Sequence, residues 1–252
     1  MVDVRGTAGP AVLLLPGGAE AVDGFFPGLA EGLIADPGAR VLLYDRPAAP
    51  LAGASADLHA MLGEAGLGPV VVIGQSLGGA VALLLARDHP GDVAGLVLLD
   101  PSPVNDVAGA GQVERAMRVI LALSRVPLAG RAIPALMRKA VERSGKGRDE
   151  PPEIRAARER MRDVDLEKLG RAAEGLEALA RGFREADLPR VPAVVVTADR
   201  KPTARMRQAH RRLAEALGAP LLSWPGAQHE VHLSHPGEVL EACRRVVSSL
   251  RA

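Results

Sequence analysis

Six short apolar blocks, most of them separated by stretches with helical periodicity, limit the fold of this chain more than any other feature. The blocks are AVLLLP (11–16), RVLLYD (40–45), VVVI (70–73), GLVLLD (95–100), AVVVTA (193–198) and PLLSW (220–224). Strands that are apolar throughout are typical of parallel sheets covered by helices on both faces. We therefore expect an α/β fold, with a mostly parallel sheet of about six strands and helices on both of its faces.

The stretch from residue 104 to residue 186 interrupts this alternation, because it contains amphipathic helical patterns and no strand-like block. Two sets of apolar residues share a helical face there, and they are Met117, Ile120 and Leu121, then Ile133, Leu136, Met137, Ala140 and Val141. We expect residues 1–103 and 187–252 to form the core that contains the sheet, and residues 104–186 to form a helical insertion.

Charge and composition exclude several classes of protein. The 252 residues include 31 Lys and Arg against 30 Asp and Glu, so the net charge of +1 provides no attraction to nucleic acid or to an anionic membrane surface. No segment reaches the roughly 18 apolar residues of a membrane helix, and the first residues lack the apolar core of a signal peptide. We expect a soluble, cytoplasmic protein without a nucleic-acid or membrane partner, and the sequence gives no indication of oligomeric state. Cys243 is the only cysteine, which excludes an internal disulfide and a Cys-x-x-Cys metal site.

The stretch VVVIGQSLGGAVALLLA (70–86) contains the candidate nucleophile. Its first four residues predict a buried strand, and its last ten predict a helix. The Gly-x-Ser-x-Gly turn between them places Ser76 in a sharp bend, where a Cβ atom at position 74 or 78 would clash. Such a bend projects the serine hydroxyl above the sheet, and the N–H of Leu77 at the start of the helix can donate to an oxyanion.

A serine nucleophile needs a base, and residues 225–239 (PGAQHEVHLSHPGEV) offer His229, His232 and His235. His229 follows the last apolar block after a short loop, which places it at the carboxyl edge of the sheet, so it is the candidate base. Three histidines spaced three residues apart, without a cysteine or a suitably spaced carboxylate, do not match the common metal-ligand sets. We therefore expect no metal and no organic cofactor. Surface or capping roles are expected for the histidines in or beside predicted helices, which are His59, His89 and His210.

With these features the chain resembles the α/β-hydrolase fold family, in its serine-nucleophile branch. The resemblance is carried by LLLPGG (13–18), YDRP (44–47), GQSLGG (74–79), LVLLDPSP (96–103) and GAQHEVHLSHPGEV (226–239). It covers roughly residues 10–105 and 188–252, and the chain order of serine, acid and histidine is that of the family. It implies a Ser-His-acid triad, and it implies that residues 104–186 form a helical cap or lid over the site.

Two loops depart from the family's pattern. Pro16-Gly17-Gly18 stands where the family often has His-Gly after its first parallel strand. A backbone N–H needs no particular side chain, so Gly18 or Ala19 can still complete an oxyanion hole with Leu77. Only about ten residues precede this loop, so the antiparallel strands that usually lie before it are largely missing.

The acid is the second departure. The family usually places it a few residues beyond the block AVVVTA, and Lys201 occupies the expected position here. Asp199 lies two positions earlier, and a loop of different shape can bring it to His229. Asp100, at the end of GLVLLD, is the alternative acid, because some relatives take their acid from that strand. We favour Asp199 over Asp100.

These features predict a serine hydrolase that cleaves a carboxylic ester or a related acyl substrate through an acyl-enzyme. Acyl transfer, thioester hydrolysis and C–C bond hydrolysis use the same triad and stay open. The displaced acid motivates a different class of function, a non-catalytic protein that binds an apolar ligand. Apolar residues of the insertion, among them Met117, Ile120 and Leu123, suit a small-molecule substrate with an apolar group.

Overall fold

The computed structural model describes residues 2–18, 21–47, 49–126, 135–136, 139, 150–161 and 165–250. Within them, a seven-stranded sheet has the order β1-β3-β2-β4-β5-β6-β7. The strands are β1 (Asp3–Arg5), β2 (Ala11–Leu15), β3 (Arg40–Leu43), β4 (Val70–Gln75), β5 (Val93–Leu99), β6 (Ala193–Val196) and β7 (Leu221–Leu222). All neighbouring pairs are parallel except β1 and β3. The expected α/β fold is confirmed, with seven strands in place of about six.

The additional strand is β1, which pairs antiparallel with Val41–Leu43 of β3. It has only three residues, and two of them, Asp3 and Arg5, are charged and pair with each other. A search for apolar blocks cannot detect such a strand. Charged side chains on a short edge strand also limit pairing with other chains.

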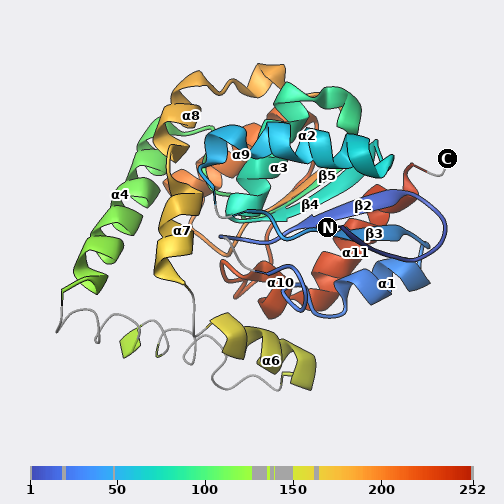
Figure 1. Ribbon diagram of the computed structural model, residues 1–252, viewed down its shortest axis with the longest axis horizontal. Helices are drawn as coiled ribbons and strands as arrows, with labels where there is room; N and C mark the ends of the chain where they lie inside the picture. The colour runs from blue at the N-terminus through green and yellow to red at the C-terminus, as the bar shows by residue number, and fades with distance from the viewer. Residues whose placement is uncertain are drawn as a thin grey trace.

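Helices cover both faces of the sheet (Figure 1). The helices α1 (Leu29–Ala35) and α11 (Pro236–Ser248) pack on one face, whereas α2 (Ala54–Ala65), α3 (Leu77–Asp88) and α9 (Arg205–Leu217) pack on the other. The side chains of Val70 and Val72 belong to the core cluster shared with α3, and those of Val71 and Ile73 belong to the cluster shared with α11. Because successive strand residues point to opposite faces, a strand covered on both sides is apolar at every position.

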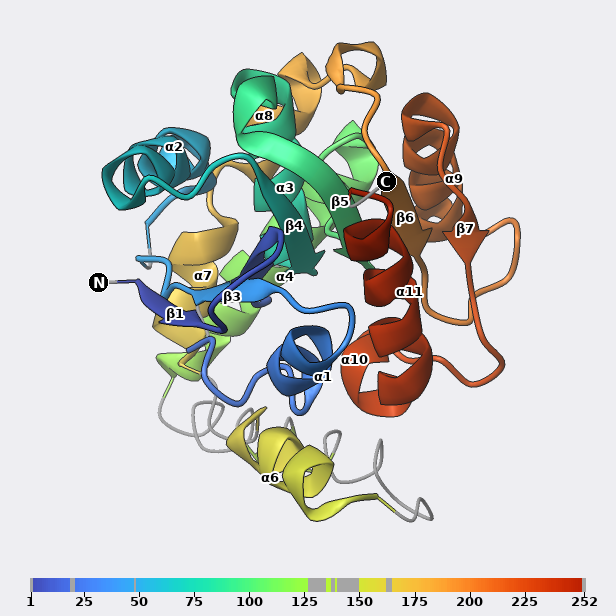
Figure 2. The same cartoon turned by 90° about the vertical axis from the view of Figure 1, so that its right-hand side faces the viewer.

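Between β5 and β6, the described residues form helices and no strand. They are α4 (Val107–Ser124), α6 (Pro152–Arg160), α7 (Leu166–Ala173), α8 (Leu176–Gly182) and the 3₁₀ helix η4 (Glu185–Asp187). Helix α4 packs against α7 and α8. Helix α6, at the lower edge of Figure 2, packs through Ile154 and Ala157 on Leu233 of α10 (Val231–Ser234). The division into core and cap stays a prediction, and Ile133, Met137, Ala140 and Val141 of the second expected helical face lie outside the described residues.

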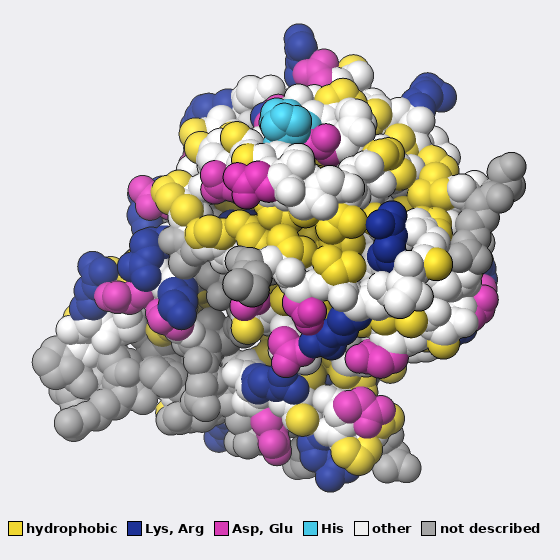
Figure 3. All heavy atoms as spheres, turned by 45° about the vertical axis from the view of Figure 1, so that its right-hand side comes forward, with side chains coloured by type: hydrophobic (Ala, Val, Ile, Leu, Met, Phe, Trp, Pro, Cys, Tyr) yellow, Lys and Arg dark blue, Asp and Glu magenta, His cyan; other side chains and the backbone are white. Residues whose placement is uncertain are grey.

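The remaining elements are the short 3₁₀ helices η1 (Leu51–Gly53) and η2 (Pro90–Asp92). On the face drawn in Figure 3, basic and acidic side chains are interspersed and form no patch of one sign, as the near-balance of charges in the sequence suggests. Among the residues that the structure describes, no helix has both the length and the apolar character needed to span a membrane.

Candidate active site

Ser76 lies in a strained turn between β4 and α3. Its φ of 52° and ψ of −119° fall outside the regions that a residue with a side chain readily adopts. A Cβ atom on Gly74 would lie 2.5 Å from the carbonyl oxygen of Gly78, and a Cβ atom on Gly78 would lie 2.2 Å from that of Leu15. The clash expected from the sequence is therefore confirmed, and glycine is required at both positions.

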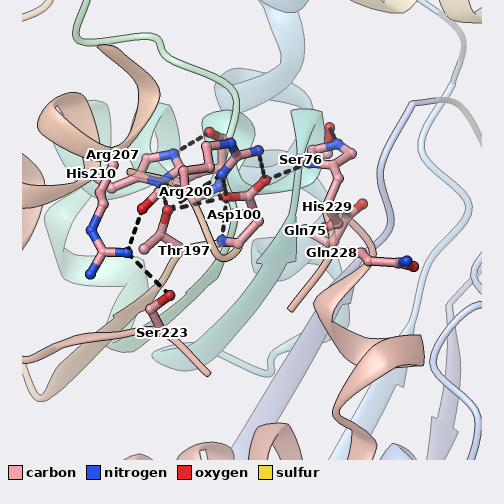
Figure 4. Close-up of polar contacts among 12 residues, drawn as sticks. Gln75, Ser76, Asp100, Thr197, Arg200, Arg207, His210, Ser223, Gln228 and His229 are labelled. Carbon is pink, nitrogen blue, oxygen red and sulfur yellow. Dashed lines mark hydrogen bonds and ion pairs between the residues drawn. The ribbon is translucent and has the colours of Figure 1, made fainter. Parts of the chain in front are cut away.

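The imidazole of His229 lies between the Ser76 hydroxyl and a carboxylate (Figure 4). Its Nε2 is 3.0 Å from Ser76 Oγ, and its Nδ1 is 2.6 Å from Asp100 Oδ2. His229 is carried by the loop between β7 and α10, and its carbonyl oxygen accepts a hydrogen bond of 3.1 Å from Gln75 Nε2. Since a carboxylate only accepts hydrogen bonds, Nδ1 carries the proton, and the lone pair of Nε2 faces the serine hydroxyl.

The acid in contact with His229 is Asp100, so the preference for Asp199 is wrong in its geometry. Asp100 directly follows β5, the neighbour of the strand that leads to Ser76, and its side chain therefore reaches the same edge of the sheet. Asp199 follows β6, one strand further away, and its carboxylate accepts a hydrogen bond of 2.9 Å from the N–H of Gly226. Its own N–H donates to the carbonyl of Ala227. Asp199 thus shapes the loop that precedes His229 without contacting the ring.

The Asp100 carboxylate is buried, with a side chain only 1% exposed, and it is surrounded by donors. The guanidinium of Arg200 contacts both of its oxygens, with Nη2 at 2.6 Å from Oδ2 and Nη1 on Oδ1. The backbone N–H of Ala198 donates to Oδ1 at 2.9 Å. Burial disfavours the charged carboxylate, but the hydrogen bonds from Arg200 and His229 outweigh this effect and hold the pKa of Asp100 well below its ordinary value.

His210 of α9 contacts one residue next to Asp100 and one residue next to Ala198 in the chain. It is fully buried, its Nδ1 is 2.9 Å from Thr197 Oγ1, and its Nε2 is 2.8 Å from the carbonyl oxygen of Pro101. Burial lowers the pKa of His210, so its ring is neutral, with the proton on Nε2. The surface or capping role expected for this histidine is wrong, because α9 turns it toward the sheet.

The pKa of His229 is shifted in the opposite direction. Burial lowers the pKa of its imidazole, but the hydrogen bond to Asp100 and the charge of that carboxylate outweigh burial and raise it above its ordinary value. The ring is nevertheless 44% exposed, so it can exchange protons with solvent and meet a substrate.

The loop after β2 passes close to Ser76. A Cβ atom on Gly17 would lie 3.1 Å from Ser76 Cβ, and Gly18 has a φ of 62°. The carbonyl oxygen of Gly18 accepts a hydrogen bond of 2.8 Å from Nη2 of the buried Arg46. Leu77 opens α3, so its N–H is among those that lack an intrahelical partner. Ala19, the other candidate oxyanion donor, lies outside the described residues, and the role of Gly18 and Leu77 as an oxyanion hole stays a prediction.

Two inserted helices contact this loop. A Cβ atom on Gly18 would lie 3.0 Å from Cδ1 of Leu169 in α7. Arg160 of α6 donates a hydrogen bond of 3.0 Å from Nη1 to the carbonyl oxygen of Asp23. The inserted helices therefore reach the residues beside Ser76 and bring an apolar side chain to Gly18.

Sequence reasoning missed Arg200 and Gln75, which hold Asp100 and His229. The available signal was the run Asp199-Arg200-Lys201, because two basic residues lie at and beside the position where the family usually has its acid.

A model of one protein family matches this chain. The family is described as the alpha/beta hydrolase family, and the match covers residues 12–242. The chain belongs to the alpha/beta hydrolase family. The match runs from β2 into α11, so it includes the inserted helices and every strand except β1, and the resemblance stated from the sequence is confirmed.

Curated relatives of this alpha/beta hydrolase are distant and match it in part. The sn-1-specific diacylglycerol lipase ABHD11 of Mus musculus is 35% identical over 113 residues, which are 40% of this chain and 37% of that protein. Lipase LipV of Mycobacterium tuberculosis (strain ATCC 25618 / H37Rv) is 52% identical over 60 residues, 24% of this chain and 23% of LipV. The matches therefore span little more than a third of the mouse lipase and less than a quarter of LipV.

Solved structures resemble the hydrolase over its whole length. BpoC from Mycobacterium tuberculosis H37Rv covers 100% of this chain and 96% of its own, with a TM-score of 0.76 and 18% sequence identity. A thermophilic esterase from Thermogutta terrifontis covers 100% of this chain and 94% of its own, with a TM-score of 0.71 and 21% identity. At such identities the likeness establishes the fold alone.

Proposed function

We propose that this chain is a serine hydrolase that cleaves a carboxylic ester, or a related acyl substrate, with Ser76, His229 and Asp100 as its triad. One observation carries the proposal: a single imidazole lies 3.0 Å from a serine hydroxyl and 2.6 Å from a buried carboxylate. This is the arrangement in which a histidine removes the serine proton while the acid fixes its tautomer.

In the first half of the reaction, Ser76 Oγ attacks the acyl carbonyl carbon and its proton passes to His229 Nε2. Asp100 stabilises the imidazolium through Nδ1–H. The negative charge on the carbonyl oxygen is stabilised by the N–H groups of Leu77 and Gly18, and removal of one such donor typically costs about 2.7–4 kcal/mol. The tetrahedral intermediate then expels the alcohol, which takes the proton from Nε2, and an acyl-enzyme remains.

In the second half, water attacks the acyl-enzyme. His229 Nε2 accepts one proton of the water, and the collapse of the second tetrahedral intermediate returns a proton to Ser76 Oγ. The acid product leaves and the triad is restored. Water and the acyl substrate are the only reactants in this scheme.

The substrate class follows from the surroundings of Ser76. Leu169 lies against Gly18, so an acyl or alkyl group beside the oxyanion loop meets an apolar side chain. The two curated relatives are named as lipases, which favours an ester with an apolar acyl chain over a small polar one.

The alternative of a non-catalytic binding protein was motivated by the displaced acid. The contact of Asp100 with His229 weakens that motivation.

The test combines labelling with turnover. A fluorophosphonate probe should label the wild type and not Ser76→Ala, and p-nitrophenyl esters of increasing acyl length should be hydrolysed by the wild type alone. Ser124→Ala is a matched control, because that serine lies at the end of α4 and, among the described residues, its hydroxyl bonds only to the carbonyl of Leu121. Full hydrolysis by Ser76→Ala, or an unlabelled wild type, would contradict the proposal.

A further inference from the structure

Arg200 occupies the side of Asp100 that His229 leaves free. Its Nη2 is 2.6 Å from Oδ2, the same oxygen that lies 2.6 Å from His229 Nδ1, while its Nη1 contacts Oδ1. The Arg200 side chain is 26% exposed and that of Asp100 is 1% exposed, so this is a mostly buried, bidentate ion pair. Such pairs fix the plane of a carboxylate as well as its charge.

Arg200 is itself held in place. Nη1 of Arg207 in α9 donates to the carbonyl oxygen of Arg200 at 2.9 Å and lies 3.3 Å from Ser223 Oγ (Figure 4). Nη1 of Arg200 is also 3.4 Å from Thr197 Oγ1. The guanidinium is therefore anchored through its backbone and through the buried cluster behind Asp100.

We propose that Arg200 is a positioning residue that holds the Asp100 carboxylate in the plane His229 requires and offsets part of its charge. The inference rests on the proposed function, and it explains how the acid can follow β5 although the usual acid position after β6 is occupied by Lys201. Asp100 has a φ of 46°, and Arg200 ties its carboxylate to the loop that follows β6.

Arg200 also influences the base. Its positive charge opposes protonation of His229, whereas the charge of Asp100 favours it. The other titratable groups that act on His229 or on its partner carboxylate come from the neighbouring loop, α9 and α10, and they are Glu230, His210 and His232. Loss of the guanidinium therefore raises the pKa of His229 and lets the carboxylate rotate.

The test uses two substitutions with different losses. Arg200→Gln removes the positive charge and the bidentate contact with Asp100. We expect kcat to fall by about a hundredfold, because His229 is then misplaced, and KM to stay nearly unchanged. Its acid limb of kcat/KM should move to higher pH. Arg200→Lys keeps the charge, so its acid limb should stay near that of the wild type while kcat remains reduced. Arg211→Gln is the control, because Arg211 is 60% exposed and, in the part of the chain that the structure describes, its one ion pair is with Glu215 of the same helix.

An NMR titration of the His229 ring keeps this test separate from the test of the proposed function. If the wild type neither hydrolyses esters nor reacts with the fluorophosphonate, the function fails, and the ring titration still reports on Arg200. A His229 titration and a kcat that are both unchanged in a folded Arg200→Gln protein would overturn the role of Arg200. If Arg200→Gln does not fold, a wild-type kcat in Arg200→Lys overturns it instead.

A separate cluster lies at the opposite end of β5. His59 of α2, His89 after α3 and Asp92 of η2 each offer one ligand atom, and these atoms all lie within 4.8 Å of one another. His59 Nδ1 is 2.6 Å from Asp92 Oδ2, and the two imidazole rings are nearly parallel, with centroids 4.1 Å apart. His59 is exposed, as expected from the sequence, and it lies close enough to His89 and Asp92 for the three to share one ligand.

We infer that this cluster binds one divalent transition-metal ion such as Zn²⁺. Two imidazoles and a carboxylate are the donor types that zinc takes, at about 2.0–2.2 Å, and solvent can fill the remaining position. The stacked rings have to tilt for their nitrogen lone pairs to converge on one ion, and the exposed side chain of His59 is free to do so. The ion would take the place of the hydrogen bond between His59 Nδ1 and Asp92 Oδ2. The site is separated from Ser76 by the length of β5, a strand of seven residues, so it is unconnected with the chemistry at Ser76.

Calorimetric titration of the tag-free protein with ZnCl₂ tests this inference. We expect one ion per chain, an increase in melting temperature, and loss of both effects in His89→Ala but not in His235→Ala, whose ring stacks on Trp224 instead. Absence of binding at 100-fold excess, or binding that persists in a His59→Ala/His89→Ala protein, would overturn it.

Discussion

The substitutions Asp100→Asn and Asp199→Asn test which of the two candidate acids works with His229. The carboxylate of Asp100 accepts from His229 and Arg200 on one oxygen, and from Arg200 and Ala198 on the other. An amide has only one oxygen, so its NH₂ group must face two N–H donors whichever way it is oriented. If that group faces Nδ1, the ring takes the other tautomer, and Nε2 can no longer accept the serine proton.

We expect Asp100→Asn to lower kcat strongly, because the substitution changes the tautomer of the base, His229. The corresponding change in a serine protease with the same constellation lowers kcat by about 10⁴-fold. Since each tenfold is worth about 1.36 kcal/mol, this is about 5.4 kcal/mol of transition-state stabilisation. The unmatched donors should also lower the free energy of unfolding by about 2 kcal/mol or more.

Asp199→Asn is the matched control. Its Oδ1 can still accept from the N–H of Gly226, the only contact of the Asp199 carboxylate that the structure gives among its described residues. We expect kcat/KM to change by less than about threefold. The assay is hydrolysis of a p-nitrophenyl ester together with the rate of fluorophosphonate labelling, with urea unfolding as a check on stability.

The result that would refute this reasoning is a reversal of the two variants. If Asp199→Asn lost about 10³-fold or more in kcat while Asp100→Asn kept a tenth of the wild-type value, the working acid would follow β6. The hydrogen bond between Asp100 and His229 would then be structural.

Three further outcomes follow from named contacts. Gly78→Ala should abolish activity and destabilise the fold, because its Cβ would lie 2.2 Å from the carbonyl oxygen of Leu15. Gly63→Ala in α2 is the contrasting variant, because its Cβ would meet no atom within 4 Å. It should raise the free energy of unfolding, measured in urea, by about 0.5–1 kcal/mol. In a series of increasing pH, activity should rise as His229 loses its proton. The midpoint should lie above the ordinary histidine pKa, because the hydrogen bond to Asp100 and its charge raise the pKa of His229. A midpoint below the ordinary value would contradict the pairing of His229 with Asp100. Burial lowers the pKa of His232 to about 3 in the folded chain, from its ordinary value of 6.5. Between these two pH values, the unfolded chain binds a proton at His232 and the folded chain does not. Stability should therefore fall as pH drops from 7 to 5, and His232→Phe should reduce this loss by about 2 kcal/mol in urea titrations. An unchanged pH dependence in that variant would refute the assignment.

The sequence predicts those features that depend on local pattern or on chain order. The apolar blocks identify the central strands because a strand buried on both faces has no polar positions, and the glycines around Ser76 identify its turn because both are needed sterically. His229 follows from its place after the last block. The contact of Asp100 with His229 could not be predicted in the same way, because it depends on how the loops after β5 and β6 fold. Burial of His210 likewise depends on how α9 is rotated against the sheet.

The backbone explains why the proposed nucleophile and the proposed acid can act as one unit. Ser76 and Asp100 are the non-glycine residues with positive φ among those described, at 52° and 46°, and they follow adjacent strands. The N–H of Ser76 donates to the carbonyl of Leu99, and the N–H of Ser102 donates back to the carbonyl of Ser76, at 3.1 and 2.8 Å. Each strained turn is therefore fixed by the other, as required for strain that persists in a folded protein. His229 then has to meet a pair of groups whose separation is already set, and the hydrogen bond from Gln75 to its carbonyl helps to hold it there.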